Sequence, residues 1–386
     1  MQLQQISKAK TKGEDDVKKR VSIVLSIIAL FAVTFSLVAC DNGSIGGFAT
    51  MIKYANADKY LVGSQTYTDA ITSVKVDWAF GEVILVQTDG TTASVEEAAD
   101  GLTEDQRVRS YVDGNTLRIK FWKSGYSATL ENPSLKTVTV TIPSLPGELD
   151  VEAASATIQA KGKLQAAVLE LSSTSGMIEV DELTATSVDL ETTSGSITAS
   201  KITASAMDLD SMSGSIDVGE IVVDGGDVDC DTSSGSIKLD KITARKVDVE
   251  STSGKIKLGE VICNSIECDS SSASQTVGKL QCATKAEFTC TSGSIEVLQA
   301  EVNTISADTS SGTVEVELKA FISADLESTS GNVDISLKCG AKAYIKTTSG
   351  SKNIKLAHSD ENGYALIGDG TGTLNIKTTS GNVTIK

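Results

Sequence analysis

A short phrase, Ser-Gly followed one residue later by Ile or Val, recurs through most of this chain at an almost fixed spacing. Residues 188–199 read VDLETTSGSITA, and residues 207–218 read MDLDSMSGSIDV. Most copies lie 19 residues apart, with exceptions of 20, 21 and 31 residues. The turn glycines are Gly176, Gly195, Gly214, Gly235, Gly254, Gly293, Gly312, Gly331, Gly350 and Gly381, with Ala156 and Ala273 in two further copies. A fixed period near 20 residues is typical of a solenoid, in which each repeat forms one coil.

Apolar residues alternate on both sides of each turn glycine. With the glycine at position zero, they occupy positions −7, −5, +2 and +4 in most copies. In the copy centred on Gly214 they are Met207, Leu209, Ile216 and Val218. Residues two apart point to one side of a strand, so each copy predicts two strands that face an interior. A third short side follows around Ile202 and Ile242. The predicted fold class is all-β, a single-chain parallel β-helix or β-solenoid with coils of about 19 residues.

Stacking of such coils leads to further expectations. We expect about 12 coils between residues 147 and 386, each about 4.8 Å from the next. The turn glycines suit a positive φ that β-branched residues do not adopt. Ser and Thr at positions −3 to −1 are expected to bond to one another and to the turn backbone. The last strand, residues 382–386, is expected to leave an open edge that could pair with a second molecule.

The first 40 residues carry a targeting pattern. Basic residues at 18–20 precede an uncharged apolar run, residues 21–39, which ends in LVAC at Cys40. This ending resembles the bacterial lipobox, and the resemblance implies cleavage that leaves Cys40 as a lipid-bearing N-terminus. The alternative is an uncleaved membrane helix, because 19 apolar residues can just span a bilayer. In both cases the rest of the chain lies outside the cytoplasmic membrane.

The predicted organisation has four parts. Residues 1–39 are a signal or anchor segment, and residues 40–66 are the lipid cysteine and a tether. Residues 67–146 form an N-terminal β cap region, and residues 147–386 form the solenoid. Within the cap, strands are predicted at 74–85 and 138–142, a hairpin at 109–122 with its turn at 113–115, and a loop or short helix at 94–105.

The cap and the repeats together resemble a known family. Residues 74–85 contain Asp-Trp and Gly-Glu-Val and precede many Ser-Gly-x-Ile or Ser-Gly-x-Val turns. This arrangement resembles the bacterial putative-adhesin family of β-strand repeats, domain of unknown function 4097, over residues 70–386. The resemblance implies an envelope-anchored β-solenoid, adhesin-like by analogy, with no catalytic residues to carry over.

The net charge of the chain limits which classes of molecule can bind it. The formal net charge is −17, and without residues 1–39 the chain has 28 basic and 48 acidic residues. Such a surface repels nucleic acid and favours metal cations or cationic peptides and polymers. We therefore expect no nucleic-acid partner.

Carboxylates recur at the outward positions −6 and −4. The ten central ones, which we call the acidic face, are Asp189, Glu191, Asp208, Asp210, Asp229, Asp231, Asp248, Glu250, Glu267 and Asp269. In stacked coils, neighbouring carboxylates of one column stand about 5 Å apart and repel by about 1 kcal/mol in water. Counter-ions, nearby lysines or a bound partner should offset this repulsion.

Two interpretations of the acidic face stay open. It could dock divalent cations or cationic groups, or it could be a solvated face that keeps a long rod soluble and blocks aggregation. No specific Ca²⁺ loop is present: residues 227–231 begin like an EF-hand, but Thr232 replaces the required glycine and Lys238 the bidentate glutamate. The only cofactor considered is Ca²⁺ on this face.

Six cysteines follow Cys40. Cys263 and Cys282 fall near the same side of adjacent coils and are the only pair placed for a disulfide. Cys230 and Cys268 share an interior column two coils apart, about 10 Å, which is too far. The alternative for all six is a buried thiol that acts as a small hydrophobe.

No residues assemble a recognisable catalytic site. His358, the only histidine, is expected in a loop within the expansion between Gly350 and Gly381. Polysaccharide lyases also use parallel β-helices, but their sites need basic residues and aromatic platforms. Here the organised face is acidic, and Trp78 and Trp122 lie in the cap region.

The predicted function is therefore non-catalytic. We expect a membrane-anchored extracytoplasmic β-solenoid with an adhesive, structural or envelope-stress role. Its partners would be the membrane, through a lipid or an N-terminal helix, and an envelope protein or cell-surface component. The alternative is a binding module that uses the acidic face for divalent cations or cationic peptides and polymers.

Overall fold

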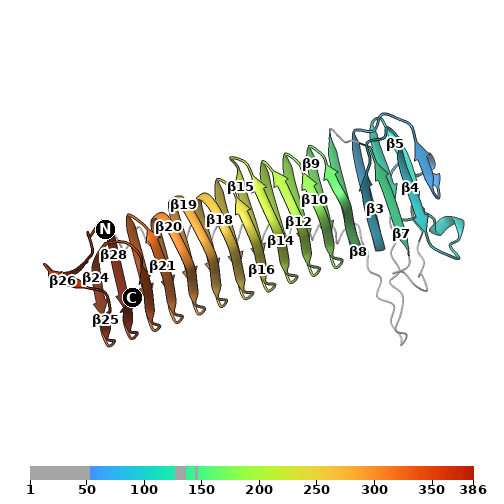
Figure 1. The fold of residues 1–386 in the computed structure, drawn as a ribbon. Coiled ribbons are helices and arrows are strands. Elements are labelled where there is room, and N and C mark those ends of the chain that lie inside the picture. The colour runs from blue at the N-terminus through green and yellow to red at the C-terminus, as the bar shows by residue number, and fades with distance from the viewer. Residues whose placement is uncertain (1–52, 127–135, 144–146) are drawn as a thin grey trace, which may run out of the picture.

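The computed structural model describes residues 53–126, 136–143 and 147–386. The predicted signal segment, residues 1–39, and the predicted lipid site, Cys40, lie outside the described residues. Over the described ranges, no helix is long and apolar enough to cross a membrane. The chain forms a rod of stacked strands with a cap at one end (Figure 1).

The described part of the cap contains two short 3₁₀ helices and seven strands, and four of these strands were predicted closely: the two single strands and the two strands of the hairpin. Residues 94–105, predicted as a loop or short helix, instead supply one strand and the start of a 3₁₀ helix. Ordered elements also begin before residue 67, within the segment predicted as a tether. The elements are η1 (Ala57–Lys59), β1 (Leu61–Val62), β2 (Gln65–Tyr67), β3 (Ser73–Gln87), β4 (Ala93–Ala98), η2 (Glu104–Gln106), β5 (Arg109–Asp113), β6 (Thr116–Lys120) and β7 (Thr137–Ile142).

A buried lysine ties the cap elements together. The Lys136 side chain is 1% exposed and lies 4.0 Å from the centre of the Phe121 ring. Its ammonium donates to the backbone carbonyls of Gln106 and Phe121 and lies 3.1 Å from the Glu97 carboxylate. Burial lowers the pKa of Lys136 to about 8, and Glu97 partly opposes this. The buried ammonium of Lys136 thus has two carbonyl acceptors and one carboxylate partner at this end of the rod.

The solenoid follows as a continuous series of strands. They are β8 (Glu148–Gln165), β9 (Val168–Ser173), β10 (Ile178–Thr184), β11 (Ser187–Thr192), β12 (Ile197–Ala204), β13 (Ala206–Ser211), β14 (Ile216–Val223), β15 (Asp227–Thr232), β16 (Ile237–Thr243), β17 (Lys246–Ser251), β18 (Ile256–Ser270), β19 (Gln275–Cys290), β20 (Ile295–Thr309), β21 (Val314–Ala320), β22 (Ser323–Ser328), β23 (Val333–Leu337), β24 (Ala341–Thr347), β25 (Lys352–Ile354), β26 (His358–Glu361), β27 (Tyr364–Ile367), β28 (Gly372–Thr378) and β29 (Val383–Ile385).

The coils stack in parallel and in register, as predicted. Leu190 pairs with Leu209, and Ile197 pairs with Ile216, each side chain lying directly on its counterpart. These residues are fully buried and form one continuous core with the rest of the interior columns. The solenoid has about 10 turns, fewer than the 12 expected.

Buried Ser and Thr side chains hold each corner. The Gly195 N–H donates to Thr192 Oγ1 at 2.9 Å, and the Thr192 hydroxyl donates to the carbonyl of Gly176 in the preceding coil at 3.4 Å. The same pair of bonds recurs at Ser211, which serves Gly214 and the Gly195 carbonyl. In most coils the hydroxyl at position −3 therefore joins a corner to its neighbour in the stack, and the predicted bonding to the turn backbone is confirmed.

The reason for glycine at position zero differs from the prediction. None of the ten turn glycines has a positive φ; the positive-φ glycines lie elsewhere in the described chain. A Cβ at Gly214 would instead overlap the carbonyl of Gly195, and the same clash recurs up the stack. Glycine is needed because backbones approach too closely for any side chain.

The copy with Ala273 in place of glycine has a compensating change. Gln275 occupies position +2, where other copies have Ile or Val, and it is 1% exposed. Its side-chain amide donates to the carbonyls of Cys268 and Thr289 and to Ser270 Oγ. A buried amide with three acceptors thus stabilises the altered corner.

The order of the coils departs from the order of the chain at both ends. In the cap, β3 lies between β8 on one side and β6 with β7 on the other. At the far end, β28 and β29 lie between β22 with β23 and β24 with β25. The last coil in sequence therefore fills a slot inside the stack.

This insertion overturns the prediction of an open edge at residues 382–386. Val383 pairs with Val333 on one side and with Lys352 on the other. The long spacing between Gly350 and Gly381 holds the returning connection, which contains the antiparallel hairpin of β26 and β27. His358, expected in a loop, lies exposed in β26. The outermost coil is instead formed by β24 and β25.

We expect Gly214→Ala to lower the free energy of unfolding by more than about 2 kcal/mol, because its Cβ meets the Gly195 carbonyl and the backbone must move. Gly90→Ala is the matched control, since its Cβ would have no contact closer than 3.5 Å. Urea denaturation followed by circular dichroism measures both. Equal stability of the two variants would contradict the close-packing explanation.

Deleting residues 372–386 tests the inserted coil. The deletion empties the slot between β22 and β24, so the amides of β24 should lose their protection from hydrogen exchange while those of β11 and β13 keep theirs. If the coils followed chain order, β24 would remain paired with β22 and stay protected. Amide exchange read by mass spectrometry distinguishes the two outcomes.

Candidate functional site

The structure brings the ten residues of the acidic face together in two columns. On β11, β13, β15, β17 and β18, Asp189 pairs with Asp208, and the column continues through Asp229 and Asp248 to Glu267. The second column runs beside it in the same register, from Glu191 through Asp210, Asp231 and Glu250 to Asp269. Neighbouring strands lie about 4.8 Å apart, so like charges face one another at every step.

At the C-terminal end of the −6 column, lysines partly offset the repulsion between its carboxylates. Lys246 Nζ lies 2.7 Å from Asp248 Oδ2 and 3.8 Å from Glu267 Oε2. Lys285 forms an ion pair with Glu287 in the next coil. Each lysine belongs to position −8 of its own strand, two residues before its acidic partner. The expectation that nearby lysines offset the repulsion is confirmed for this part of the face.

In the −4 column, protonation of two carboxyls reduces the repulsion between neighbouring coils. Burial, with the carboxylates of Asp208 and Asp229 adding to it, raises the pKa of Asp210 to about 8. Burial and then Asp229 and Glu250 raise the pKa of Asp231 to about 9. Both carboxyls are half-buried by their neighbours, so the charged form loses water as well as facing like charges. At neutral pH these two groups hold protons.

Some carboxylate oxygens on this face have no internal partner. Oδ1 of Asp231, of Asp248 and of Asp269 is buried and accepts no hydrogen bond from the described residues. Burial, with Glu267 next, raises the pKa of Asp269 to about 6. Unpaired buried oxygens raise the free energy of the folded state unless a proton or a ligand satisfies them.

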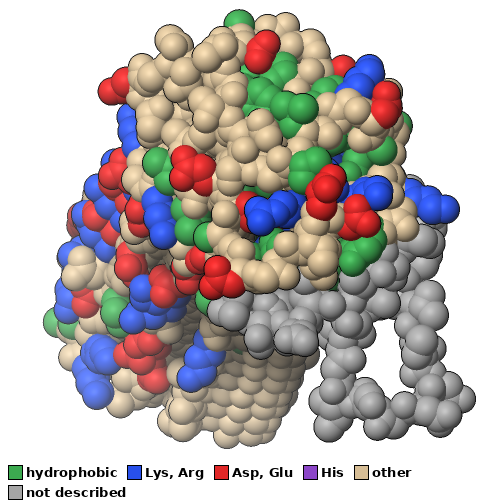
Figure 2. All heavy atoms as spheres, turned by 90° about the vertical axis from the view of Figure 1, so that its right-hand side faces the viewer, with side chains coloured by type: hydrophobic (Ala, Val, Ile, Leu, Met, Phe, Trp, Pro, Cys, Tyr) green, Lys and Arg blue, Asp and Glu red, His purple; other side chains and the backbone are tan. Residues whose placement is uncertain are grey.

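A third column in the same coils alternates basic and acidic residues instead of repeating acids. At position +6, six successive coils alternate acidic and basic residues in direct register: Glu182, Lys201, Glu220, Lys241, Glu260 and Lys279. Lys163, at position +7 of the preceding copy, pairs with Glu182 after a register shift and continues the alternation. Glu220 lies 2.7 Å from Lys201 and 3.2 Å from Lys241. Viewed from the cap end, basic and acidic side chains are interspersed along one side of the rod (Figure 2). Reading position +6 along the sequence would have found this column, which the prediction omitted.

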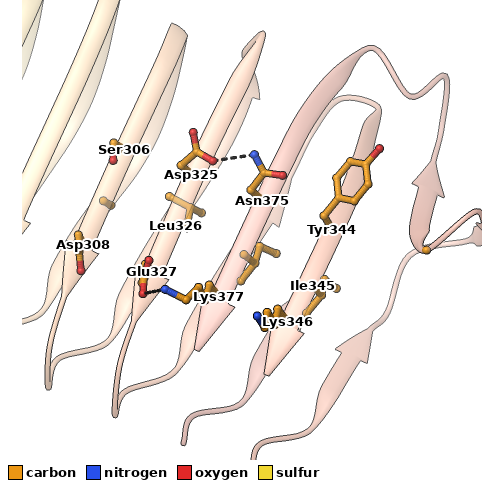
Figure 3. A pocket seen from close by; sticks show the side chains of 13 residues that line it. Ser306, Asp308, Asp325, Leu326, Glu327, Tyr344, Ile345, Lys346, Asn375 and Lys377 are labelled. Carbon is orange, nitrogen blue, oxygen red and sulfur yellow. Dashed lines mark hydrogen bonds and ion pairs between the residues drawn. The ribbon is translucent and has the colours of Figure 1, made fainter. Parts of the chain in front are cut away.

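Toward the C-terminal end of the chain, positions −6 and −4 no longer hold only carboxylates. There, position −6 runs from Asp325 to Asn375 to Tyr344, and position −4 runs from Glu327 to Lys377 to Lys346. Asn375 Nδ2 donates to Asp325 Oδ1 at 2.7 Å, and Lys377 pairs with Glu327 (Figure 3).

A groove of about 460 Å³ lies over these strands. It is lined by apolar side chains of the −5 column as well as by the polar pairs, and Gly363 of the hairpin contributes to its wall. Its acids at Asp325 and Glu327 already have partners, so the groove is internally compensated. The acidic face, whose two columns contain only carboxylates, lies nearer the middle of the rod.

One further trio of carboxylates has the spacing of a metal site among the described residues. Single oxygens of Glu148, Asp150 and Glu170 lie within 4.8 Å of one another. Lys75 Nζ lies 3.0 Å from Asp150 and 3.1 Å from Glu148, so a lysine already provides positive charge there. The trio adjoins the acidic face but is not part of it.

The chain matches a known family model over nearly all of its described length. The model for the Toastrack DUF4097 family matches residues 71–232 and 226–386. No curated protein matches the chain.

Several solved structures are similar to the chain at low sequence identity. A putative adhesin from Parabacteroides merdae ATCC 43184 is 13% identical, with 84% of this chain and 96% of that chain covered and a TM-score of 0.33. A putative adhesin from Bacteroides fragilis NCTC 9343 is 14% identical, with 84% and 97% covered and a TM-score of 0.21. A putative cell adhesion protein from Clostridium sporogenes ATCC 15579 is 10% identical, with 84% and 99% covered and a TM-score of 0.17.

The protons on the acidic face predict an unusual dependence of stability on pH. The pKa values of Asp210 and Asp231 are raised in the folded chain, so between about pH 4 and pH 9 the folded state holds protons that the unfolded state has lost. Their stabilisation is complete below the unfolded pKa and disappears as the pH rises through the folded values. Thermal unfolding of Asp210→Asn/Asp231→Asn should therefore vary less between pH 5 and pH 9 than that of the wild type.

The variant should also be more stable than the wild type at pH 9, by on the order of 2 kcal/mol after screening. Glu220→Gln is the matched control, because Lys201 and Lys241 lower the pKa of Glu220 and it stays ionised throughout this range. A wild type and an Asn variant with the same slope between pH 5 and pH 9 would show that the two carboxyls are ionised at neutral pH.

Proposed function

The chain belongs to the Toastrack DUF4097 family, and from this membership and its charged rod we propose that it is a non-catalytic, adhesive β-solenoid of a bacterial cell envelope. The lipobox-like ending at Cys40 supports a lipid anchor, with the solenoid projecting from the membrane. A rigid rod of this kind presents the same outward positions many times, which suits repeated weak contacts with a second surface. The work of the chain is then binding rather than catalysis.

We further propose that the acidic face is the binding surface and that its partner is cationic. The observation that carries this proposal is the difference between two columns of the same coils. At position +6 the sequence alternates charges, so each acid is neutralised by the coil above and below it. At position −4 it repeats acids from Glu191 to Asp269, although the stacking geometry is the same. Stacking alone therefore does not explain the like-charged column.

The dimensions of the face suit an extended cationic segment. From Glu191 to Asp269 the −4 column covers four coil spacings, or about 19 Å. An extended peptide of about six residues has this length. Its amino or guanidinium groups would pair with the carboxylates of Asp210 and Asp231, which a bound cation would keep ionised.

Binding of such a partner is coupled to proton release. A cation favours the ionised carboxylate, and Asp210 and Asp231 hold protons at neutral pH. The partner must displace these protons, so its affinity rises as the pH rises toward 9. It also falls with added salt, because the attraction is electrostatic.

Binding of hexalysine to the whole chain tests this proposal. We expect affinity to rise between pH 6 and pH 9 by about tenfold or more, measured by calorimetry at low salt. The variant with Glu191→Gln, Asp210→Asn, Asp231→Asn and Glu250→Gln should bind at least about tenfold more weakly and lose the pH dependence.

The control removes a similar charge from the alternating column through Glu182→Gln, Glu220→Gln and Glu260→Gln. Equal weakening in both variants would mean that net charge alone attracts the probe, which would contradict a dedicated face. Titration with millimolar Ca²⁺ tests the alternative ligand, because Ca²⁺ prefers carboxylate oxygens. A rise in melting temperature with Ca²⁺ that Asp208→Asn/Asp229→Asn abolishes would make the face a cation site instead.

A further inference from the structure

Two cysteines occupy the same interior place in consecutive coils. Cys263 of β18 and Cys282 of β19 are direct partners in the parallel ladder, and both are buried. The same place, nine residues after the turn, is taken in other coils by Ala204, Val223 and Val302. An apolar column thus contains two thiols side by side.

The spacing of this pair meets the requirement for a disulfide. Partners on adjacent parallel strands lie about 4.8 Å apart, and disulfides join Cα atoms that are about 4.4 to 6.8 Å apart. The two thiols share a hydrogen bond, and Cys282 Sγ also lies 3.2 Å from the Asn264 carbonyl. The two residues therefore have the backbone spacing of a disulfide, and their thiols already lie in contact.

The other thiols of the solenoid are placed differently. Cys230 and Cys268 are separated by Val249 of the intervening coil. Cys290 takes the place of the corner Ser or Thr: it accepts from Gly293 N–H at 2.9 Å and donates to the Ala273 carbonyl at 3.2 Å. These cysteines have structural explanations that the adjacent pair does not share.

We propose that Cys263 and Cys282 form a disulfide between adjacent coils once the chain enters an oxidising compartment. The compartment rests on the proposed envelope location, whereas the pairing rests on geometry alone. The oxidant is a small-molecule or enzyme disulfide. The thiolate of one cysteine attacks it and releases one thiol, and the second cysteine then attacks the mixed disulfide and releases the other. The pair loses two electrons and two protons, and one disulfide of the oxidant becomes two thiols.

The local chemistry favours this exchange. The hydrogen bond from Cys263 lowers the pKa of Cys282, which favours its reactive thiolate form. The same bond raises the pKa of Cys263. The pair stands in apolar surroundings with only small exposed fractions, 6% for Cys263 and 4% for Cys282, so a small oxidant should react slowly.

The bond would strengthen the stack at an unusual corner. It joins the coil of Gly254 to the coil of Ala273, where the turn glycine is missing and Gln275 supplies the compensating bonds. A solenoid is stable only through contacts between neighbouring coils. A covalent link here restricts the unfolded chain and opposes separation of these two coils.

The test uses the full chain, prepared reduced and then incubated with oxidised glutathione. After unfolding, free thiols are labelled with N-ethylmaleimide and counted by mass spectrometry. The sequence has seven cysteines. We expect two fewer labels after oxidation, a peptide linked through Cys263 and Cys282, and a melting temperature several degrees higher that dithiothreitol reverses.

Two variants complete the test. Cys263→Ala/Cys282→Ala should fold, since alanine occupies this place in other coils, and should lose the redox-dependent shift in melting temperature. Cys339→Ser should keep it. Retention of all labels in folded, glutathione-treated protein, or a link through other cysteines, would overturn the pairing. A pair that oxidises in the tube but is reduced in protein isolated from cell envelopes would overturn the compartment and with it the proposed location.

Discussion

In-register stacking of parallel coils places every side chain about 4.8 Å from its counterparts in the neighbouring coils. At the corners this approach leaves no room for a Cβ, because the carbonyl of one turn glycine lies against the α-carbon of the turn glycine in the next coil. A buried hydroxyl such as that of Thr192 bridges the two glycines. In the interior the stacking lays Leu190 on Leu209 without a gap. The same spacing sets the electrostatics, because an acid in one coil lies beside the residue at the same position in the next coil. Acids repeated at one position therefore repel one another along the rod.

The repeat made the architecture predictable from the sequence. A constant period fixes which residues pair, and alternation fixes which side they face, so the burial of Leu209 and the exposure of Asp208 followed from position alone. For this reason the two columns of the acidic face could be named before any coordinates were known. The register of strands β11 to β18 confirms that arrangement.

Other features lay beyond a local pattern. The coil of residues 372–386 has the same apolar alternation whether it ends the rod or fills a slot within it, so its insertion beside β22 and β24 could not be inferred. Glycine is compatible with both a positive φ and a close approach, and only the coordinates show which applies at Gly214. The protonation of the acidic face depends on how deeply neighbouring residues bury each carboxyl, and the sequence alone does not give this burial.

The central claim is that stacked carboxyls at position −4 hold protons at neutral pH and release them to a cationic partner. Carbon-13 NMR of aspartate side-chain carboxyls reads this state directly, with Asp210→Asn and Asp231→Asn used to assign the two signals. The account predicts titration midpoints of about 8 for Asp210 and about 9 for Asp231. Midpoints near 4, the ordinary range for an aspartate, would contradict it.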